Sequence, residues 1–286
     1  MKKILVPTDF SISADYGIHY ALELAKIFDA SIDLSHSLIP FESGFYSISE
    51  SNKENLNTEK NLINRLAKIK SHILKSNSDL PISFYVDRGP ESIQITKFCK
   101  KNKIDLIVMG TKGASGLKEA IVGSFTADVM TKAPCLVMAI PQKCKFKRPK
   151  RITYASDYDK KDIRIIQSIF NLNSFFNAQI NILHIDDTNN DTESSKAFNK
   201  YKIKTENNFP DVPLSFQHIE GEDVAKEILH ATFADKTDIL VISPIKREGI
   251  WNHLFHKSIT KTVSYHIHIP LLTIPFTKYH QIKNPI

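Results

Sequence analysis

The chain carries the same pattern of segments twice, and this duplication limits its possible folds more than any other feature. Residues 2–9 read KKILVPTD and residues 150–157 read KRITYASD: a basic pair, a β-prone run, a small residue and an aspartate. Four more pairs of similar segments follow in the same order: 31–37 with 179–185, 86–93 with 218–225, 104–110 with 237–243, and 133–141 with 269–275. Five corresponding segments in one order predict a duplicated domain.

Each half alternates short apolar runs with amphipathic helical patterns. In the first half we expect strands over 3–8, 31–37, 82–87, 104–109 and 135–140, and helices over 13–28, 55–76, 90–101 and about 117–131. Strands that alternate with helices predict right-handed βαβ units in a doubly wound parallel sheet. We therefore expect domains over 1–142 and 150–276, a basic linker over 143–149 and a C-terminal tail over 277–286.

Length and composition favour a cytoplasmic protein with no membrane partner. The 286 residues are enough for two domains of ordinary size. No apolar run approaches the roughly 18 residues of a membrane span, and Pro7 interrupts the N-terminal apolar run too early for a secretory signal. Three cysteines without CxxC spacing indicate a reducing compartment and no structural zinc.

The net charge of +7 raises the question of a polyanionic partner. The densest basic cluster falls between the two halves and consists of Lys143, Lys145, Lys147, Arg148 and Lys150. A solvated linker explains this cluster. A nucleic-acid patch is the alternative, which the presence of a single nearby aromatic, Phe146, weakens, so we expect no nucleic-acid partner.

A glycine pattern follows the fourth apolar run of the first half. Gly110, Gly113, Gly123 and Ser124 give the spacing G-x2-G-x9-G-S. Gly110 would let the backbone approach a ribose, and Gly113 would permit a tight turn. Gly123 and Ser124 would open onto a helix whose N-terminal N–H groups make a site for phosphates. The alternative is that these glycines only shape a tight loop.

In this spacing the chain resembles the universal stress protein family, in its ATP-binding branch. The resemblance covers both halves and includes ILVPTDFS at 4–11, the histidine that ends the second strand, and PCLVMAIP at 134–141. It implies an α/β fold of two tandem Rossmann-like domains, similar to the adenine nucleotide alpha hydrolases, each with strand order 3-2-1-4-5. Ligands of such sheets bind where the winding reverses, here beside strands one and four.

The resemblance also implies which residues hold ATP. Asp9 would lie near the ribose or a Mg²⁺ ion, Ser37 near the adenine, and Met109 with Gly110 against the sugar. The full set of expected nucleotide-binding residues is Pro7, Thr8, Asp9, Ser37, Met109, Gly110, Gly113, Gly123, Ser124, Phe125 and Thr126.

The second half lacks this motif, so we expect that it does not bind ATP in the same way. The three glycine positions are occupied by Ser243, Lys246 and either His256 or Lys257. Asp157 keeps the position of Asp9, but a strand-end aspartate is commonly a helix cap. His253 and His256 could form a metal pair, although no carboxylate or cysteine completes a ligand set. Asp186 and Asp187 resemble a polar loop rather than an acid–base pair.

These patterns predict a regulatory, ATP-binding stress-response protein whose two halves form an intramolecular pseudo-dimer through their fifth strands. A homodimer is left open. The sequence contains no nucleophile–base pair and no Walker lysine, so we expect at most slow ATP hydrolysis. The alternatives are an ATP-using transferase, for which only Lys112 or Lys118 is available, and an interaction scaffold that binds no nucleotide.

Overall fold

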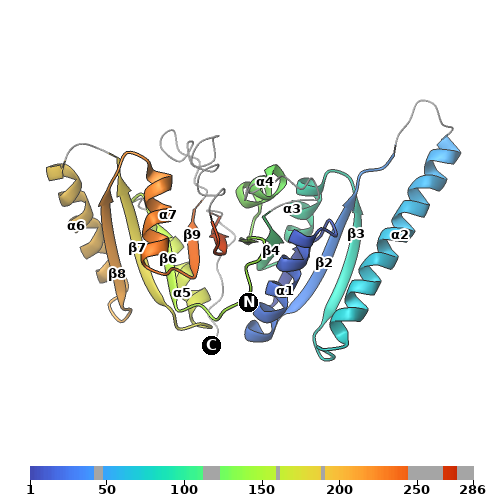
Figure 1. Ribbon diagram of the computed structural model, residues 1–286, viewed down its shortest axis with the longest axis horizontal. Coiled ribbons are helices and arrows are strands. Elements are labelled where there is room, and N and C mark those ends of the chain that lie inside the picture. Colours follow the sequence, from blue (N-terminus) through green and yellow to red (C-terminus); the bar gives the residue numbers. More distant parts are fainter. Residues whose placement is uncertain (42–47, 112–122, 159–161, 188–190, 244–266, 276–286) are drawn as a thin grey trace.

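The computed structural model describes residues 1–41, 48–111, 123–158, 162–187, 191–243 and 267–275 (Figure 1). Strands and helices alternate along the first half. They are β1 (Lys3–Pro7), α1 (Ile12–Phe28), β2 (Ser31–Leu38), α2 (Ile48–Leu74), β3 (Ile82–Arg88), α3 (Glu91–Asn102), β4 (Leu106–Gly110), α4 (Ser124–Lys132) and β5 (Leu136–Ile140). The expected strands are confirmed to within two residues at each end. Helix α2 begins seven residues before the expected start, and residues 117–122 lie outside the described residues.

The second half repeats the order of strands and helices. Its elements are β6 (Arg151–Ala155), α5 (Asp162–Asn173), β7 (Gln179–Asp186), α6 (Asp191–Asn208), β8 (Leu214–Glu220), α7 (Val224–Ala234), β9 (Ile239–Ile242) and β10 (Leu271–Thr273). The segment between β9 and β10, which replaces the glycine motif, lies mostly outside the described residues.

All ten strands form one sheet in the order β3-β2-β1-β4-β5-β10-β9-β6-β7-β8. Within each half the strands are parallel and follow the order 3-2-1-4-5. The predicted doubly wound α/β fold and its strand order are therefore confirmed. The winding reverses between β1 and β4 in the first half, and between β6 and β9 in the second.

The two halves meet where β5 pairs with β10, which is the one antiparallel pair among the described strands. Met138 pairs with Leu272, and the repeated segments 135–141 and 269–275 place these two residues at equivalent positions. On either side, Val137 pairs with Thr273, which is the counterpart of Ala139. Ala139 pairs with Leu271, which is the counterpart of Val137. Such a self-matching register is what a two-fold contact between equal surfaces requires. The expected contact between the fifth strands is thus present.

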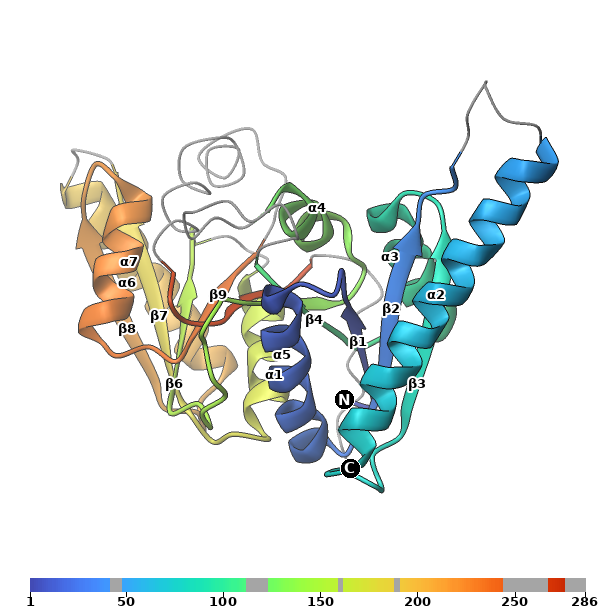
Figure 2. The ribbon, with the colours of Figure 1, turned by 45° about the vertical axis from the view of Figure 1, so that its right-hand side comes forward.

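Helices cover both faces of the sheet (Figure 2). One buried cluster contains side chains of α1, α2, α5 and α6, and a second contains side chains of α3, α4 and α7. Both clusters include residues of both halves, so each layer of core is continuous across the joint. Among the described helices, none combines the length and apolarity needed to cross a membrane.

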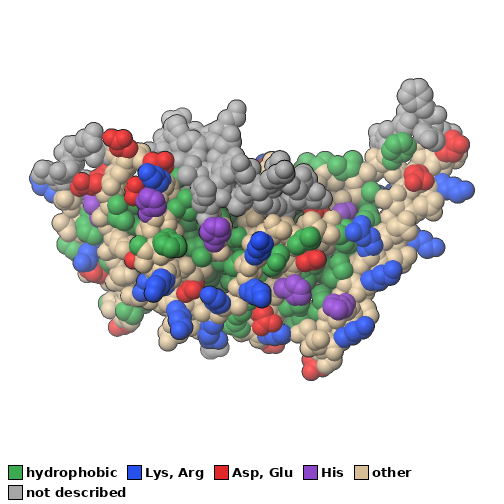
Figure 3. Space-filling view, in the orientation of Figure 1, with side chains coloured by type: hydrophobic (Ala, Val, Ile, Leu, Met, Phe, Trp, Pro, Cys, Tyr) green, Lys and Arg blue, Asp and Glu red, His purple; other side chains and the backbone are tan. Residues whose placement is uncertain are grey.

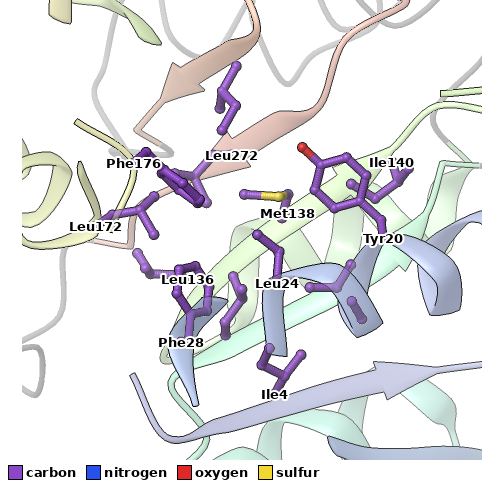
Figure 4. Close-up of a cluster of buried hydrophobic side chains, with 14 of the residues drawn as sticks. Ile4, Tyr20, Leu24, Phe28, Leu136, Met138, Ile140, Leu172, Phe176 and Leu272 are labelled. Atoms are coloured by element: carbon purple, nitrogen blue, oxygen red, sulfur yellow. The ribbon is translucent and has the colours of Figure 1, made fainter. Parts of the chain in front are cut away.

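Aromatic contacts reinforce the joint beneath β5 and β10 (Figure 4). The ring of Phe28, the last residue of α1, lies 4.8 Å from that of Phe175 and 5.7 Å from that of Phe176, just after α5. Phe28 is fully buried among Leu24, Leu136 and Leu172. This contact links residues almost 150 positions apart, so it stabilises the association of the halves as well as each half.

Replacing Phe28 by alanine should therefore lower the free energy of unfolding by about 3 kcal/mol, because a large aromatic side chain leaves a cavity that its neighbours only partly fill. Urea unfolding followed by circular dichroism measures the change. Phe233→Ala is the matched control, since Phe233 is 89% exposed and its loss should shift the same free energy by no more than about 0.5 kcal/mol. Equal effects of the two substitutions would contradict a shared core at the joint.

Candidate functional site

The fold brings most of the expected site residues to one edge of the sheet. Pro7 ends β1 and Gly110 ends β4, and these strands are hydrogen-bonded neighbours at the reversal point. Ser37 is the second-last residue of the neighbouring strand β2. Helix α4 begins near the same edge, at the top of Figure 1. Gly113 lies outside the described residues, as do Lys112 and Lys118.

The turn after β1 is fixed by its own side chains. Thr8 is buried, and its Oγ1 accepts a hydrogen bond from the Phe10 N–H at 3.0 Å. Asp9 Oδ1 accepts from the Ser11 N–H at 3.0 Å, and Ser11 in turn caps α1. Phe10 takes the left-handed conformation, with φ 62°. In the described part of the chain no hydrogen bond uses Oδ2 of Asp9, so this oxygen can face a ligand or a cation.

A second carboxylate, that of Glu91, lies beside Asp9, and the sequence patterns did not predict it. Glu91 is the first residue of α3, and its pKa is raised to about 7, chiefly by burial and then by the negative charge of Asp9. Two carboxylates in one partly buried place favour a bound cation. The described residues include no group of three or more His, Cys, Asp or Glu side chains arranged for a metal. A metal at this site would therefore need further ligands from elsewhere.

Gly110 has a packing reason to be glycine. A Cβ atom there would lie 2.4 Å from the carbonyl oxygen of Ser13 and 2.6 Å from its Oγ. A Cβ on Gly17 would likewise lie 3.0 Å from the backbone nitrogen of Gly110. Two glycines thus let α1 lie directly on the end of β4. The spacing predicted a glycine that makes room for a ligand, whereas this contact shows one that makes room for a helix.

Gly123 is different, because its backbone conformation does not call for glycine. It precedes α4 with φ −60° and ψ 153°, angles that any residue adopts. Its N–H donates to the carbonyl of Thr111 at 2.7 Å, which ties the helix start to the end of β4. A glycine that neither turn geometry nor left-handed φ requires is consistent with a close approach by another molecule.

Within the described residues, the backbone N–H groups of Ser124, Phe125 and Thr126 in the first turn of α4 have no hydrogen-bond acceptor. Backbone N–H groups at the start of a helix have no intrahelical acceptor and attract anions. Ser124 is exposed, and Phe125 is half-buried. Thr126 is buried and donates its hydroxyl to the Gly110 carbonyl at 3.1 Å. Its side chain therefore holds the helix against the strand, which leaves its backbone N–H for an anion.

His36 has a structural role in this turn. Its Nδ1 lies 2.7 Å from the Thr8 carbonyl oxygen, which can only accept, so Nδ1 carries the proton. The ring of Phe10 lies 4.9 Å from that of His36, and the guanidinium of Arg65 on α2 lies 3.7 Å above the Phe10 ring. These contacts connect β1, β2 and α2 beside the site.

The second half keeps the frame of this turn. Ser156 Oγ accepts from the Tyr158 N–H at 3.1 Å, and His184 Nδ1 lies 2.8 Å from the Ser156 carbonyl. Tyr158 has φ 59°, like Phe10 in the first half. The same backbone turn thus follows β1 in the first half and β6 in the second. Ser243 replaces Gly110 and donates to the Ile274 carbonyl at 3.2 Å, while Lys246, His253, His256 and Lys257 lie outside the described residues.

Polar side chains fill positions in the second half that are apolar in the first. Tyr158 stacks on His184 at 3.8 Å, and its hydroxyl lies 3.2 Å from His218 Nδ1. His218 Nε2 lies 3.7 Å from Asp186, a buried residue that ends β7. The expectation of a polar loop at Asp186 is therefore wrong. By the repeat, Leu38 and Val86 stand where the second half has Asp186 and His218.

Asp162, at the start of α5, is the centre of a buried hydroxyl network. Its carboxylate accepts from Tyr154 at 3.0 Å, from Tyr201 at 2.9 Å, and from Ser156. Burial raises its pKa from 3.8 to about 6 despite these hydrogen bonds. The corresponding first-half residues of Tyr154 and Asp162 are Val6 and Ala14, so this network is specific to the second half.

Asp162→Asn should make stability less dependent on pH. Because the pKa of Asp162 is higher in the folded state, its contribution is favourable at low pH and is lost as the pH rises through about 6. The wild type should lose on the order of 2 kcal/mol relative to the variant between about pH 4 and 7. Urea unfolding across that range measures the difference. For Asp211→Asn, at an exposed position, the free energy of unfolding should vary with pH as it does in the wild type. The same pH dependence for Asp162→Asn would contradict a raised pKa of Asp162.

Comparisons with known proteins agree with this architecture. The profile of the universal stress protein family matches residues 1–141. Universal stress protein MJ0531 of Methanocaldococcus jannaschii is 31% identical over 162 residues, which cover 52% of this chain and 84% of that protein. Universal stress protein MJ0577 of the same organism is 26% identical over 155 residues, which cover 50% of this chain and 96% of that protein.

A solved structure resembles the whole chain. The crystal structure of a universal stress protein from Archaeoglobus fulgidus superposes with a TM-score of 0.67 over 96% of each chain, at 15% identity. At that identity the likeness concerns the fold alone. The sequence relatives carry the assignment further, because MJ0531 is matched over most of its length at more than 30% identity. The chain belongs to the universal stress protein family.

Proposed function

We propose that the first half binds an adenine nucleotide at the carboxyl ends of β1 and β4, and that the protein acts as a nucleotide-dependent regulator of the stress response. The observation that carries this proposal is the start of α4. Its first N–H groups, which have no acceptor among the described residues, lie near the reversal point of the sheet, next to a glycine whose own backbone conformation needs no glycine.

The nucleotide would span the distance between β2 and α4. Pro7, Thr8 and Ser37 would line the nucleoside end, with Met109 and Gly110 against the sugar. The phosphates would meet Gly113, Gly123, Ser124, Phe125 and Thr126, largely through main-chain N–H groups. Each hydrogen bond to a charged phosphate contributes about 1.5–3 kcal/mol, so three or four of them suffice for micromolar binding after the cost of association.

A Mg²⁺ ion bound with the nucleotide would be held by Asp9, with Glu91 nearby. The carboxylates of these residues supply oxygen ligands, the type that Mg²⁺ prefers, and the phosphates would supply the rest. In this role the ion neutralises phosphate charge and fixes the orientation of the nucleotide. No residue of the chain is proposed as a nucleophile or general base, so we expect binding without rapid turnover.

The second half would serve a different purpose. Ser243 carries a side chain where the first half has none, and Lys246 replaces a second glycine. We propose domains over 1–142 and 150–276 that pair as an intramolecular pseudo-dimer, with only the first one binding ATP. In this arrangement the second half supplies the β10 edge that β5 requires.

Nucleotide released from the purified protein distinguishes this proposal from its rivals. The full chain is heat-denatured and the supernatant is separated by ion-exchange chromatography, while a second sample is incubated with Mg-ATP and assayed for ADP. Bound or added ATP that persists without turnover supports a regulatory switch. Steady production of ADP would indicate an enzyme. Protein that carries no nucleotide and rejects added ATP would be a scaffold, contrary to the proposal.

A further inference from the structure

The connection between the halves is basic and contains no compensating charge. From Val129 to Ser156 the sequence has no Asp or Glu, and it has seven Lys or Arg residues: Lys132, Lys143, Lys145, Lys147, Arg148, Lys150 and Arg151. The linker runs from the carboxyl end of β5, where Ile140 pairs with Gly110, to the start of β6 at the opposite edge of the sheet.

This linker is held in place rather than loosely solvated. The ring of Phe146 packs edge-on against Tyr20 of α1 at 5.1 Å. Arg148 Nη2 donates to the Phe175 carbonyl at 2.6 Å, and the backbone N–H of Lys150 donates to Asp238 at 2.8 Å. The linker is thus attached to both halves. The backbone positions of its lysines on the surface are therefore fixed.

Three lysines of the linker are exposed, whereas the residues between them are half-buried. Cys144 and Phe146 are half-buried, and Lys143, Lys145 and Lys147 are exposed. Lys143 has φ 69° and lies in the turn in which the Cys144 N–H donates to the Pro141 carbonyl at 3.1 Å, and Lys145 and Lys147 follow that turn. None of these lysines forms an ion pair with any residue that the structure describes. We call Lys143, Lys145 and Lys147 the lysine ridge.

We propose that the lysine ridge binds the sugar–phosphate backbone of a nucleic acid without reading its bases. A row of unpaired cations matches a linear polyanion, and release of counterions from that polyanion supplies the driving force. From the sequence, the single aromatic Phe146 weakened a nucleic-acid interpretation. The packing of Phe146 against Tyr20 removes base stacking but leaves the phosphate contacts intact.

A flat anionic membrane fits this end of the molecule less well. Asp29, Asp79 and Asp211 are exposed in the loops that precede β2, β3 and β8, at the edge of the sheet that the linker reaches at β6. Figure 3 shows acidic side chains (red) interspersed with basic ones (blue) along the lower edge. A broad surface would meet these carboxylates, whereas a narrow polymer that follows the ridge would avoid them.

The test measures how binding to a fluorescein-labelled DNA duplex of about 20 base pairs depends on salt, by fluorescence anisotropy at about 50–200 mM NaCl. The ridge variant Lys143→Gln, Lys145→Gln, Lys147→Gln should bind at least tenfold more weakly. Its plot of log affinity against log salt should be shallower by roughly 2–3, because each phosphate contact contributes about 0.9 to the slope. Duplexes of different sequence should bind equally well.

The matched control removes the same charge from exposed positions of α2: Lys53→Gln, Lys60→Gln and Lys68→Gln. This control should keep the wild-type slope. An equal loss of DNA affinity in both triple variants would show an effect of net charge and would overturn the proposal that the lysine ridge binds nucleic acid. Failure of the wild type to bind the duplex at about 50 mM salt would overturn it as well. Ridge-dependent binding to phosphatidylserine vesicles but not to the duplex would overturn it in favour of a membrane. Gly123→Val should leave DNA binding unchanged, so the ridge and the nucleotide site are tested separately.

Discussion

Gly110→Ala is expected to destabilise the protein by about 4 kcal/mol or more, at the upper end of what single substitutions do. The added Cβ would lie 2.4 Å from the Ser13 carbonyl oxygen and 2.7 Å from its carbonyl carbon. These are backbone atoms in the first turns of α1, so no side-chain rotation can relieve the overlap. Helix α1 must move off β4, which would disturb both the core of the first half and the joint with the second.

Urea unfolding of Gly110→Ala measures this cost, and Ser243→Ala is its counterpart in the second half. Ser243 already carries a Cβ, so the control loses only the hydrogen bond to Ile274, at about 1 kcal/mol. A Gly110→Ala protein within about 1 kcal/mol of the wild type would contradict the packing that we describe. Loss of ATP binding in this variant would say nothing about the site, because the fold itself is affected.

Gly123→Val should instead reduce ATP affinity at least 100-fold and leave the fold intact. Valine adopts φ −60° and ψ 153° without strain, so the change should cost no more than about 1 kcal/mol of stability, through the weaker helix cap. Its branched side chain would stand in the space that the phosphates need. Isothermal titration with Mg-ATP measures the affinity, and thermal unfolding checks the fold.

A matched pair of serines serves as the control for that experiment. Ser124→Ala should weaken ATP binding by about tenfold, the value of one hydrogen bond to a charged group. Ser258 follows Lys257, one of the two second-half residues aligned with Gly123. It lies outside the described residues, and Ser258→Ala should leave the affinity unchanged. Unchanged ATP binding in Gly123→Val together with loss of ATP binding in Ser258→Ala would show that the nucleotide binds in the second half, contrary to the proposal.

The alternation of strands and helices could be predicted from the sequence because it depends on patterns that recur along the chain. Apolar runs with equal spacing identify strands, and the repeat aligns Met138 with Leu272 at the joint. The resemblance to a known family then supplied the order 3-2-1-4-5. Local hydrogen bonds such as that from Phe10 to Thr8 were also within reach, since they involve near neighbours.

Contacts between distant segments could not be predicted in the same way. Gly110 matches the motif, yet the atoms that exclude a side chain there belong to Ser13, almost 100 residues earlier. Glu91 approaches Asp9 only because α3 starts at the same edge of the sheet, although a carboxylate in the first turn of a helix was a visible signal. The pKa of Asp162 is raised because the fold buries its carboxylate, although the hydroxyls of Tyr154 and Tyr201 donate to it from separate elements.

Titration calorimetry of the full chain with Mg-ATP examines the asymmetry between the halves most directly. With bare backbone at the start of α4 and side chains at the matching place in the second half, one ATP should bind per chain, at micromolar affinity. Two equivalent sites per chain would mean that the altered second motif still accepts a nucleotide. A dissociation constant of about 1 mM corresponds to a binding free energy of only about −4 kcal/mol. Absence of heat and of saturable binding up to about 1 mM ATP would therefore mean that the first half does not bind a nucleotide either.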